Sequence, residues 1–297
     1  MHTICRSLLP APDKPPHRRL DIPTPDDDFL ELDLCEAGNG RPVVALFHGL
    51  EGSSNRYYIT ELMHRLWRNN YTSVAVNFRS CGSRLNRQPR FYHSGETQDP
   101  ATVFEWIRRT FPRSRMGAVG FSLGGNVLLK LLGEAGNRHS LDAAVAVSVP
   151  YDLAKGSKTI SRGFNRIYEY RFLRTLTKKL ELKRRIYPQL PRFTGHTLYE
   201  FDNQVTSVVH GFRDADDYYD TCSAEHFIGM IRTPSLLIHS REDPICPPGM
   251  MPLGKIRDNG SLYYIVTNKG GHVGFWSRPR GWLNRTILNF LSDKIDI

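Results

Sequence analysis

Gly120-Phe121-Ser122-Leu123-Gly124 is the stretch that decides the fold. It follows an apolar run at residues 116–119 and precedes a helical pattern over residues 126–132, so it occupies a turn between a strand and a helix. A G-x-S-x-G pentapeptide in this context is typical of a tight turn that strains the serine backbone and lifts its hydroxyl clear of the sheet. We therefore interpret Ser122 as a candidate nucleophile at a helix N-terminus; the alternative is a glycine-rich loop that happens to contain a serine.

A nucleophilic serine needs a general base and a group that orients the base. Asp243 follows one short apolar run, and His272 follows another behind a pair of glycines. The order Ser…Asp…His is the one that this strand–turn–helix architecture uses. We expect Asp243 to fix the tautomer of His272, and His272 to take the proton of Ser122. Glu242 is the alternative to Asp243 as the orienting carboxylate.

Two backbone N–H groups are expected to form an oxyanion hole. Leu123 directly follows the candidate nucleophile, and Leu50 lies in the loop His48-Gly49-Leu50-Glu51-Gly52-Ser53 after the buried strand-like run 43–47. In this architecture the two donors come from these two places. The alternative for the loop is an ordinary strand-ending turn. Several other histidines are expected to be structural: His48, His93, His210 and His239.

The composition is that of a soluble enzyme. The chain has 297 residues, of which 40% are hydrophobic, and no run approaches the ~18 apolar residues of a membrane span. Residues 1–20 are rich in proline and lack a long apolar stretch, so we expect a loosely ordered arm rather than a signal peptide. Five scattered cysteines without a C-x-x-C pair favour a reducing, cytoplasmic location and argue against zinc.

Strand-like and helix-like patterns alternate along most of the chain. This alternation predicts an α/β fold with a mostly parallel, doubly wound sheet and a site at the carboxyl ends of its strands. We expect the core to comprise residues 21–151 and 232–297. Strands are predicted at residues 28–34, 43–47, 73–78, 116–119, 143–149, 234–240 and 262–267, and helices at 57–69, 100–109, 126–132 and 279–291.

The alternation stops over residues 152–231, which we expect to form a helical cap inserted into the core. Between Lys155 and Arg192 the chain carries twelve basic residues against Glu169 and Glu181, a balance of +10 that equals the net charge of the whole chain. Apolar residues interleave with these charges at roughly helical spacing. Such a basic amphipathic segment contacts an anionic lipid surface or attracts an acidic substrate; the alternative is a solvated outer face on helices that cover the pocket.

Two other binding classes are not favoured by the sequence. No recognised nucleic-acid-binding fold or aromatic stacking motif accompanies the basic segment, so we do not expect nucleic acid as a partner. The acidic run at residues 214–220 lacks the glycine and the terminal glutamate of an EF-hand loop, and a helix start explains it better than calcium.

Several longer motifs resemble the YheT-like branch of the α/β-hydrolases. The resemblance extends from about residue 19 to the last helix and implies a serine esterase acting on carboxylic esters, with relatives that hydrolyse acylglycerols and phospholipids. It also implies that Arg79 and His93 brace the site. The motifs are FHGLEGS at residues 47–53, NFRSCG at 77–82, YHSGET at 92–97, GFSLGGN at 120–126, HGF at 210–212, DYY at 217–219 and GGHVGF at 270–275.

These observations predict a cytoplasmic serine carboxylesterase that uses no metal and no organic cofactor. Ser122 attacks the ester, Leu50 and Leu123 hold the oxyanion, and His272, oriented by Asp243, moves the proton. The expected substrate is a small-molecule or lipid ester. The alternatives are acyl transfer to an alcohol or thiol through the same acyl-enzyme, and a non-catalytic fold that binds lipid or protein.

Overall fold

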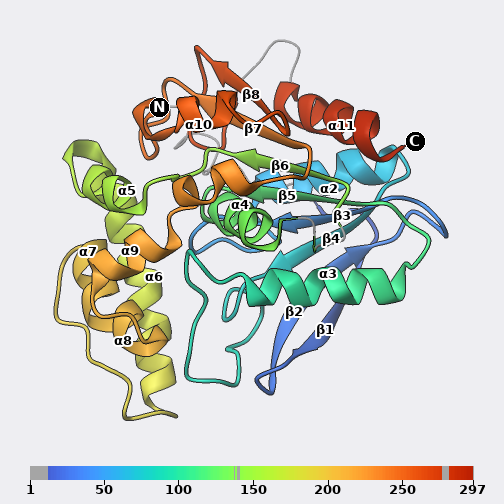
Figure 1. Cartoon of the computed structure of the whole chain (residues 1–297). Helices are drawn as coiled ribbons and strands as arrows, with labels where there is room; N and C mark the ends of the chain where they lie inside the picture. The colour runs from blue at the N-terminus through green and yellow to red at the C-terminus, as the bar shows by residue number, and fades with distance from the viewer. Residues whose placement is uncertain (1–12, 137, 139–140, 276–280, 297) are drawn as a thin grey trace.

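The protein is built on one eight-stranded sheet, seen in the computed structural model in Figure 1. The structure describes residues 13–136, 138, 141–275 and 281–296. The strand order is β1-β2-β4-β3-β5-β6-β7-β8; β1, β2 and β4 pair antiparallel, and the pairs from β4 to β8 are parallel. The strands are β1 (Arg18–Thr24), β2 (Asp28–Cys35), β3 (Val43–Phe47), β4 (Thr72–Asn77), β5 (Met116–Phe121), β6 (Ala143–Val147), β7 (Ser235–Ser240) and β8 (Leu262–Thr267).

Helices cover both faces of this sheet, as expected from the sequence. Along β3, Val43, Ala45 and Phe47 pack into the core cluster under α3 and α4, whereas Val44 and Leu46 pack under α2 and α11. Both sides of β3 are therefore buried, which explains its unbroken apolar sequence. The covering helices are α2 (Tyr57–Arg68), α3 (Gln98–Thr110), α4 (Leu123–Ala135), α10 (Leu253–Arg257) and α11 (Trp282–Ile295).

The two ends of the chain differ from the prediction. Residues 18–20, expected in a loosely ordered arm, begin β1, because this strand pairs along its full length with β2 and gains backbone hydrogen bonds that its polar sequence does not reveal. Residues 1–12 lie outside the described part. The last helix, predicted over residues 279–291, starts at Trp282 and continues to Ile295; residues 279 and 280 are also outside the described part.

All regular elements between β6 and β7 are helical. Most of them form two further apolar clusters, one that includes Leu180 and Phe201 and one that includes Tyr218 and Tyr219. The last two turns differ, because Ala224 and Ile228 pack into the core cluster under α3 and α4. Figure 1 shows α5 to α9 gathered at the left of the sheet, with the long α6 running down the group. They are α5 (Leu153–Ile160), the short 3₁₀ turn η1 (Gly163–Asn165), α6 (Arg166–Arg184), α7 (Leu198–Phe201), the π turn η2 (Asp202–Thr206), α8 (Ser207–His210), α9 (Ala215–Cys222), and the 3₁₀ turns η3 (Ala224–His226) and η4 (Ile228–Met230).

The acidic run at residues 214–220 is a helix start, since the Asp214 carboxylate accepts a hydrogen bond from Asp217 N–H at 2.8 Å and caps α9. Within the described ranges, no helix is long and apolar enough to cross a membrane.

Candidate active site

Ser122 lies at the sharp turn between β5 and α4. Its backbone has φ 53° and ψ −120°, a conformation that residues other than glycine rarely adopt. The turn closes only because its neighbours are glycines: a Cβ on Gly120 would come within 2.5 Å of the Gly124 carbonyl oxygen, and one on Gly124 within 2.6 Å of the His48 carbonyl oxygen. The strained turn predicted from the pentapeptide is therefore present.

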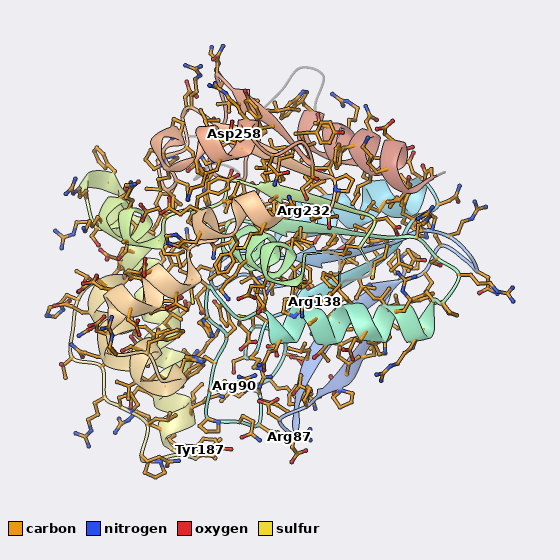
Figure 2. All side chains as sticks on the ribbon, viewed as in Figure 1. Arg87, Arg90, Arg138, Tyr187, Arg232 and Asp258 are labelled. Carbon is orange, nitrogen blue, oxygen red and sulfur yellow. The ribbon has the colours of Figure 1, made fainter. Side chains whose placement is uncertain are left out.

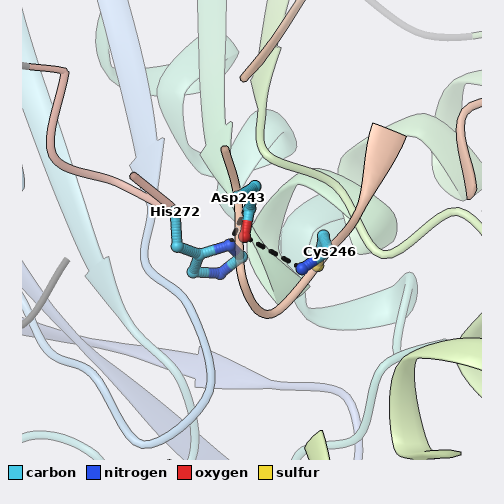
Figure 3. A group of neighbouring side chains, drawn as sticks. All are labelled: Asp243, Cys246 and His272. Atoms are coloured by element: carbon cyan, nitrogen blue, oxygen red, sulfur yellow. Dashed lines mark hydrogen bonds and ion pairs between the residues drawn. The ribbon is translucent and has the colours of Figure 1, made fainter. Parts of the chain in front are cut away.

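The structure brings together the three side chains that the sequence singled out. His272 Nε2 lies 2.7 Å from Ser122 Oγ, and His272 Nδ1 lies 2.8 Å from Asp243 Oδ2. Asp243 follows β7 and His272 follows β8, whereas Ser122 follows β5, so parallel strands of one sheet deliver the three groups to the same edge. Figure 3 shows the His272 ring beside the Asp243 carboxylate. This arrangement allows proton transfer from the serine hydroxyl to the imidazole.

Asp243 is held as a buried carboxylate. Its Oδ1 atom accepts hydrogen bonds from the backbone N–H groups of Ile245 and Cys246, each at 2.9 Å. Burial acts to raise the pKa of Asp243, but attraction to His272, the hydrogen bond from His272 and the bond from Cys246 N–H outweigh it, and the pKa lies below its ordinary value. Glu242, the alternative, is exposed, and its carboxylate accepts from Gly270 N–H at 3.4 Å. Asp243, not Glu242, therefore contacts the imidazole.

The loop after β3 leaves one N–H group free beside Ser122. The N–H groups on either side of Leu50 donate to tyrosine hydroxyls, whereas among the described residues no acceptor is found for Leu50 N–H. The two occupied bonds are Gly49 N to Tyr58 Oη at 3.0 Å and Glu51 N to Tyr92 Oη at 2.8 Å.

Leu123 N–H is the first amide of α4, where a helix has no acceptor of its own for the group. Both leucines line a cavity that contains Ser122. The two expected oxyanion donors are thus unoccupied and adjacent to the serine.

Two other buried histidines, His48 and His239, form hydrogen bonds that fix nearby loops. His48 is fully buried: its Nδ1 donates to the Gly49 carbonyl at 2.7 Å, and its Nε2 accepts from Phe78 N–H at 3.2 Å. Burial lowers the pKa of His48 to about 3, so the ring is neutral. His239 Nε2 donates to the Cys246 carbonyl at 2.6 Å and fastens the loop that carries Asp243.

Arg79 and His93 each connect separate segments of the chain. The Arg79 guanidinium is fully buried and pairs with three carboxylates, so it ties the turn before β2 to the start of α3. His93 Nδ1 accepts from Gly95 N–H at 3.2 Å, and its ring lies 4.4 Å from that of His210, so it packs a core loop against the cap. The carboxylates around Arg79 are Asp26 at 2.7 Å, Asp28 at 3.0 Å and Asp99 at 2.7 Å.

The sequence did not predict an ion pair between the cap and the loop after β3 (residues 48–53). Lys179 of α6 places its Nζ atom 2.8 Å from Glu51 Oε1, and the Glu51 side chain is almost completely buried. The Tyr92 hydroxyl donates to the same carboxylate oxygen at 2.9 Å. The backbone of Glu51 has φ 51°, a left-handed conformation next to Leu50. The Glu51 carbonyl accepts a hydrogen bond from Arg56 Nη2 at 2.6 Å. Contacts of both its side chain and its carbonyl thus hold this conformation. No local signal distinguishes Lys179 from the other basic residues of the cap.

A second lysine of α6 also points inward. Lys183 is fully buried and donates to the carbonyl oxygens of Gln88 and Arg90, the latter at 3.0 Å. Burial lowers the pKa of Lys183 to about 7. Figure 2 shows the neighbouring contact, where Tyr187 beyond the end of α6 lies beside Arg87, whose carbonyl accepts from the tyrosine hydroxyl. Two lysines of the basic segment, Lys179 and Lys183, thus bind the cap to loops of the core.

Two cavities meet at Ser122. The larger has a volume of about 330 Å³ and is bounded by the loop after β3, Arg56 and the α6 residues Tyr168, Arg171 and Phe172. The other, of about 100 Å³, is mostly apolar and runs under the cap. Its lining includes Leu123, Leu153, Ile160, Phe172, Leu198 and Ile245. Ser122 and His272 line both cavities. A molecule with two different halves can therefore place one half in each cavity, with its centre beside the Ser122 hydroxyl.

Asp243, Cys246 and His272 are close enough to be considered as metal ligands, with one candidate atom from each within 4.8 Å (Figure 3). Burial, followed by the charge of Asp243, raises the pKa of the Cys246 thiol well above its ordinary value, so the sulfur stays protonated and is a poor ligand. The carboxylate and the imidazole already bond to each other. This donor set fits a hydrogen-bonded acid–base pair better than a metal centre.

A strained serine at a strand–helix turn, a histidine and a buried aspartate at successive strand ends, and two free backbone amides define the site of an α/β-hydrolase. The family model described as the alpha/beta hydrolase fold matches residues 42–279. The chain belongs to this family, in the same branch as YheT. It is 36% identical over 292 residues to the putative esterase YheT of Escherichia coli, covering 94% of this chain and 85% of that protein.

Other relatives and solved structures agree with this assignment. A monoacylglycerol lipase of Saccharomyces cerevisiae is 29% identical over 92% of this chain, which spans 63% of that protein. The phospholipase ABHD3 of Homo sapiens is 27% identical over 99% of this chain and 76% of its own length. Among solved structures, the esterase Pf2001 of Pyrococcus furiosus superposes with a TM-score of 0.66 at 16% identity, covering 97% of this chain and 98% of the esterase, which shows the shared fold.

Proposed function

We propose that this protein hydrolyses carboxylic esters through an acyl-enzyme on Ser122. The observation that carries the proposal is the continuous chain of hydrogen bonds from Ser122 Oγ through His272 to Asp243, at 2.7 and 2.8 Å. The esterase and lipase names of its relatives support the same reaction class.

In the first half-reaction, Ser122 Oγ attacks the ester carbonyl while His272 Nε2 takes its proton. The negative charge that develops on the carbonyl oxygen accepts hydrogen bonds from Leu50 and Leu123 N–H groups. When the tetrahedral intermediate collapses, the carbon–oxygen bond to the alcohol breaks, and His272 returns the proton to the leaving alkoxide. The products of this step are the free alcohol and an ester between the acyl group and Ser122.

In the second half-reaction, water replaces the alcohol. His272 takes a proton from the water as its oxygen attacks the acyl carbonyl, and the proton is then given back to Ser122 Oγ. Asp243 keeps Nδ1 of the ring protonated and stabilises the imidazolium that forms in both halves. The acid is released, and Ser122 is regenerated.

The two cavities support an ester with unlike halves. The apolar cavity, with Leu153, Ile160 and Leu198 in its lining, suits an acyl chain, and the larger cavity, with Arg56 and Arg171, suits a polar alcohol. Small-molecule esters and lipid esters both fit this description. We propose acylglycerol-like esters as the lipid form, in line with the name of the yeast relative.

Ser122→Ala tests the proposal directly. The variant keeps the fold, since alanine is smaller than serine, and should lose at least about 10³-fold in kcat for p-nitrophenyl butyrate. Circular dichroism checks the fold, and Ser114→Ala is the control, because this serine lies before β5 and lines neither cavity that contains Ser122. Unreduced turnover in Ser122→Ala would reject the serine mechanism.

A further inference from the structure

An exposed apolar and basic surface lies at the start of α6. Phe164 of η1 is 89% exposed, Ile167 53% and Tyr170 67%. Arginines with exposed side chains interleave with them. We call this set the α6 face: Phe164, Ile167 and Tyr170 with Arg162, Arg166, Arg171 and Arg174. Three large apolar side chains that are mostly in water over seven residues mark an interaction site rather than ordinary surface.

The helical spacing puts the apolar and basic residues on the same side. Ile167, Tyr170 and Arg174 are three and four residues apart and share one stripe of α6. The acidic residue in this part of the helix points the other way: Glu169 is buried, and its carboxylate accepts from Ser161 Oγ at 2.6 Å and Leu198 N–H at 2.9 Å. The start of α6 is therefore positive on its outer side, with no exposed carboxylate among residues 162–180.

The next stripe of the same helix leads to the active site. Tyr168, Phe172 and Thr175 line the larger cavity, which also contains Ser122, and Arg171 belongs to both the cavity and the α6 face. Whatever covers the α6 face is therefore positioned at the mouth of the cavity. Apolar side chains at the centre of a basic surface match the interfacial region of an anionic bilayer, which has negative headgroups over an apolar layer.

We propose that the α6 face docks the protein on anionic lipid surfaces, so that the cavity of Ser122 opens onto lipid-borne esters. The second clause rests on the proposed function, whereas the docking itself does not. Phe164 and Ile167 enter the boundary of the acyl chains, and the arginines lie among the lipid phosphates. The protein then selects a substrate by where the substrate lies, at an anionic lipid surface, as well as by the shape of the substrate.

Co-sedimentation with vesicles tests the docking. We expect at least tenfold stronger binding to an equal mixture of phosphatidylcholine and phosphatidylglycerol than to phosphatidylcholine alone, and a loss of the difference at high salt. The double variant Phe164→Ser/Ile167→Ser should bind the mixture at least about tenfold more weakly. The matched control Val208→Ser/Met230→Ser removes two exposed apolar side chains elsewhere in the cap and its flank, and should bind as the unchanged protein does.

A second pair of variants separates this surface from basic charge in general. Arg166→Gln/Arg174→Gln should weaken binding about tenfold or more at low salt, whereas Arg185→Gln/Arg192→Gln, also exposed, should have a smaller effect. Equal losses in the two pairs, or unchanged binding in Phe164→Ser/Ile167→Ser, would overturn the proposal. So would a change of molecular mass for that variant in sedimentation velocity without a change in vesicle binding, since the face would then contact a second copy of the chain.

Hydrolysis of soluble p-nitrophenyl butyrate distinguishes failure of docking from failure of the proposed function. It should be unchanged in Phe164→Ser/Ile167→Ser, because neither residue lines a cavity that contains Ser122. Loss of vesicle binding with this turnover intact supports the proposal. Vesicle binding without any ester turnover in the unchanged protein would reject the esterase mechanism and leave the docking surface standing.

Discussion

The sheet core and the cap place their functional groups by different means. In the core, Ser122, Asp243 and His272 each follow a parallel strand, so strand pairing alone brings them to one edge. In the cap, Lys179 reaches Glu51 across 128 residues of sequence through the packing of a helix on a loop. We therefore expect the proposed reaction to depend on the sheet, and the cap to act on the shape of the site and on access to it. Changes in the core should affect chemistry most, and changes in the cap should affect stability and binding.

The largest effect is expected from the core. Asp243→Asn removes the negative charge that stabilises the imidazolium and allows the wrong tautomer of His272, so kcat should fall about 10³–10⁴-fold while the fold stays intact. Steady-state kinetics on p-nitrophenyl butyrate measures the effect. Glu242→Gln is the matched control, because its carboxylate does not contact the imidazole in the structure. Equal losses in the two variants would contradict the assignment of Asp243.

An intermediate effect is expected where the cap contacts the core. Lys179→Met leaves the buried Glu51 carboxylate without its cationic partner, which should lower the free energy of unfolding by about 3 kcal/mol. The variant should also shift the backbone of Leu50 in the loop after β3 and lower kcat about tenfold. This loss is smaller than the roughly 10²–10³-fold loss expected when an oxyanion hydrogen-bond donor is removed altogether. Urea denaturation and steady-state kinetics measure the two effects.

Charge rescue separates the electrostatic role of Lys179 from simple packing. In the double variant Glu51→Gln/Lys179→Met, the unpaired charge is gone, so part of the stability and of kcat should return. Lys178→Met, an exposed neighbour on the same helix, is the control and should behave as the unchanged protein. A double variant as impaired as the sum of the two single variants would show that the pair is not coupled.

The smallest effect on the reaction is expected at the buried lysine of the cap, where pH changes the stability of the fold. Because burial lowers the pKa of Lys183 to about 7, the folded state holds fewer protons than the unfolded state from about pH 7 up to the ordinary lysine pKa of 10.5. Stability should therefore rise with pH in this window, by at most about 1.4 kcal/mol for each pH unit from this group. Lys183→Met should flatten this part of the pH profile of urea denaturation, and Lys178→Met should not. An unchanged slope in Lys183→Met would contradict the lowered pKa of Lys183.

Much of the core could be predicted because its signals are local. The glycines around Ser122, the apolar runs and the chain order Ser…Asp…His indicated the fold and the three side chains that the structure brings together. Their catalytic roles stay predictions. The exposed position of Glu242 and the bonds that leave Leu50 N–H free could not be read from sequence, because both depend on how separate loops pack.

The cap was less predictable because a run of basic residues does not reveal which side chains point toward the core and which point into solvent. Lys179 and Lys183 insert toward core loops, and helical spacing alone does not separate them from exposed neighbours such as Lys178. The strand β1 was missed for a related reason. Its polar residues Arg18 and Arg19 pair with carboxylates that come close only once the hairpin with β2 has formed. These partners are Glu36, Asp33 and Glu31.

Covalent labelling tests the central claim most directly. A fluorophosphonate probe reacts with an activated serine, so mass spectrometry of the digested protein should find one probe on the peptide that contains Ser122, formed far more slowly in Asp243→Asn. Prior incubation with an ester substrate should slow the labelling. A probe attached to another residue, or ester turnover that continues with Ser122 unlabelled, would contradict the account.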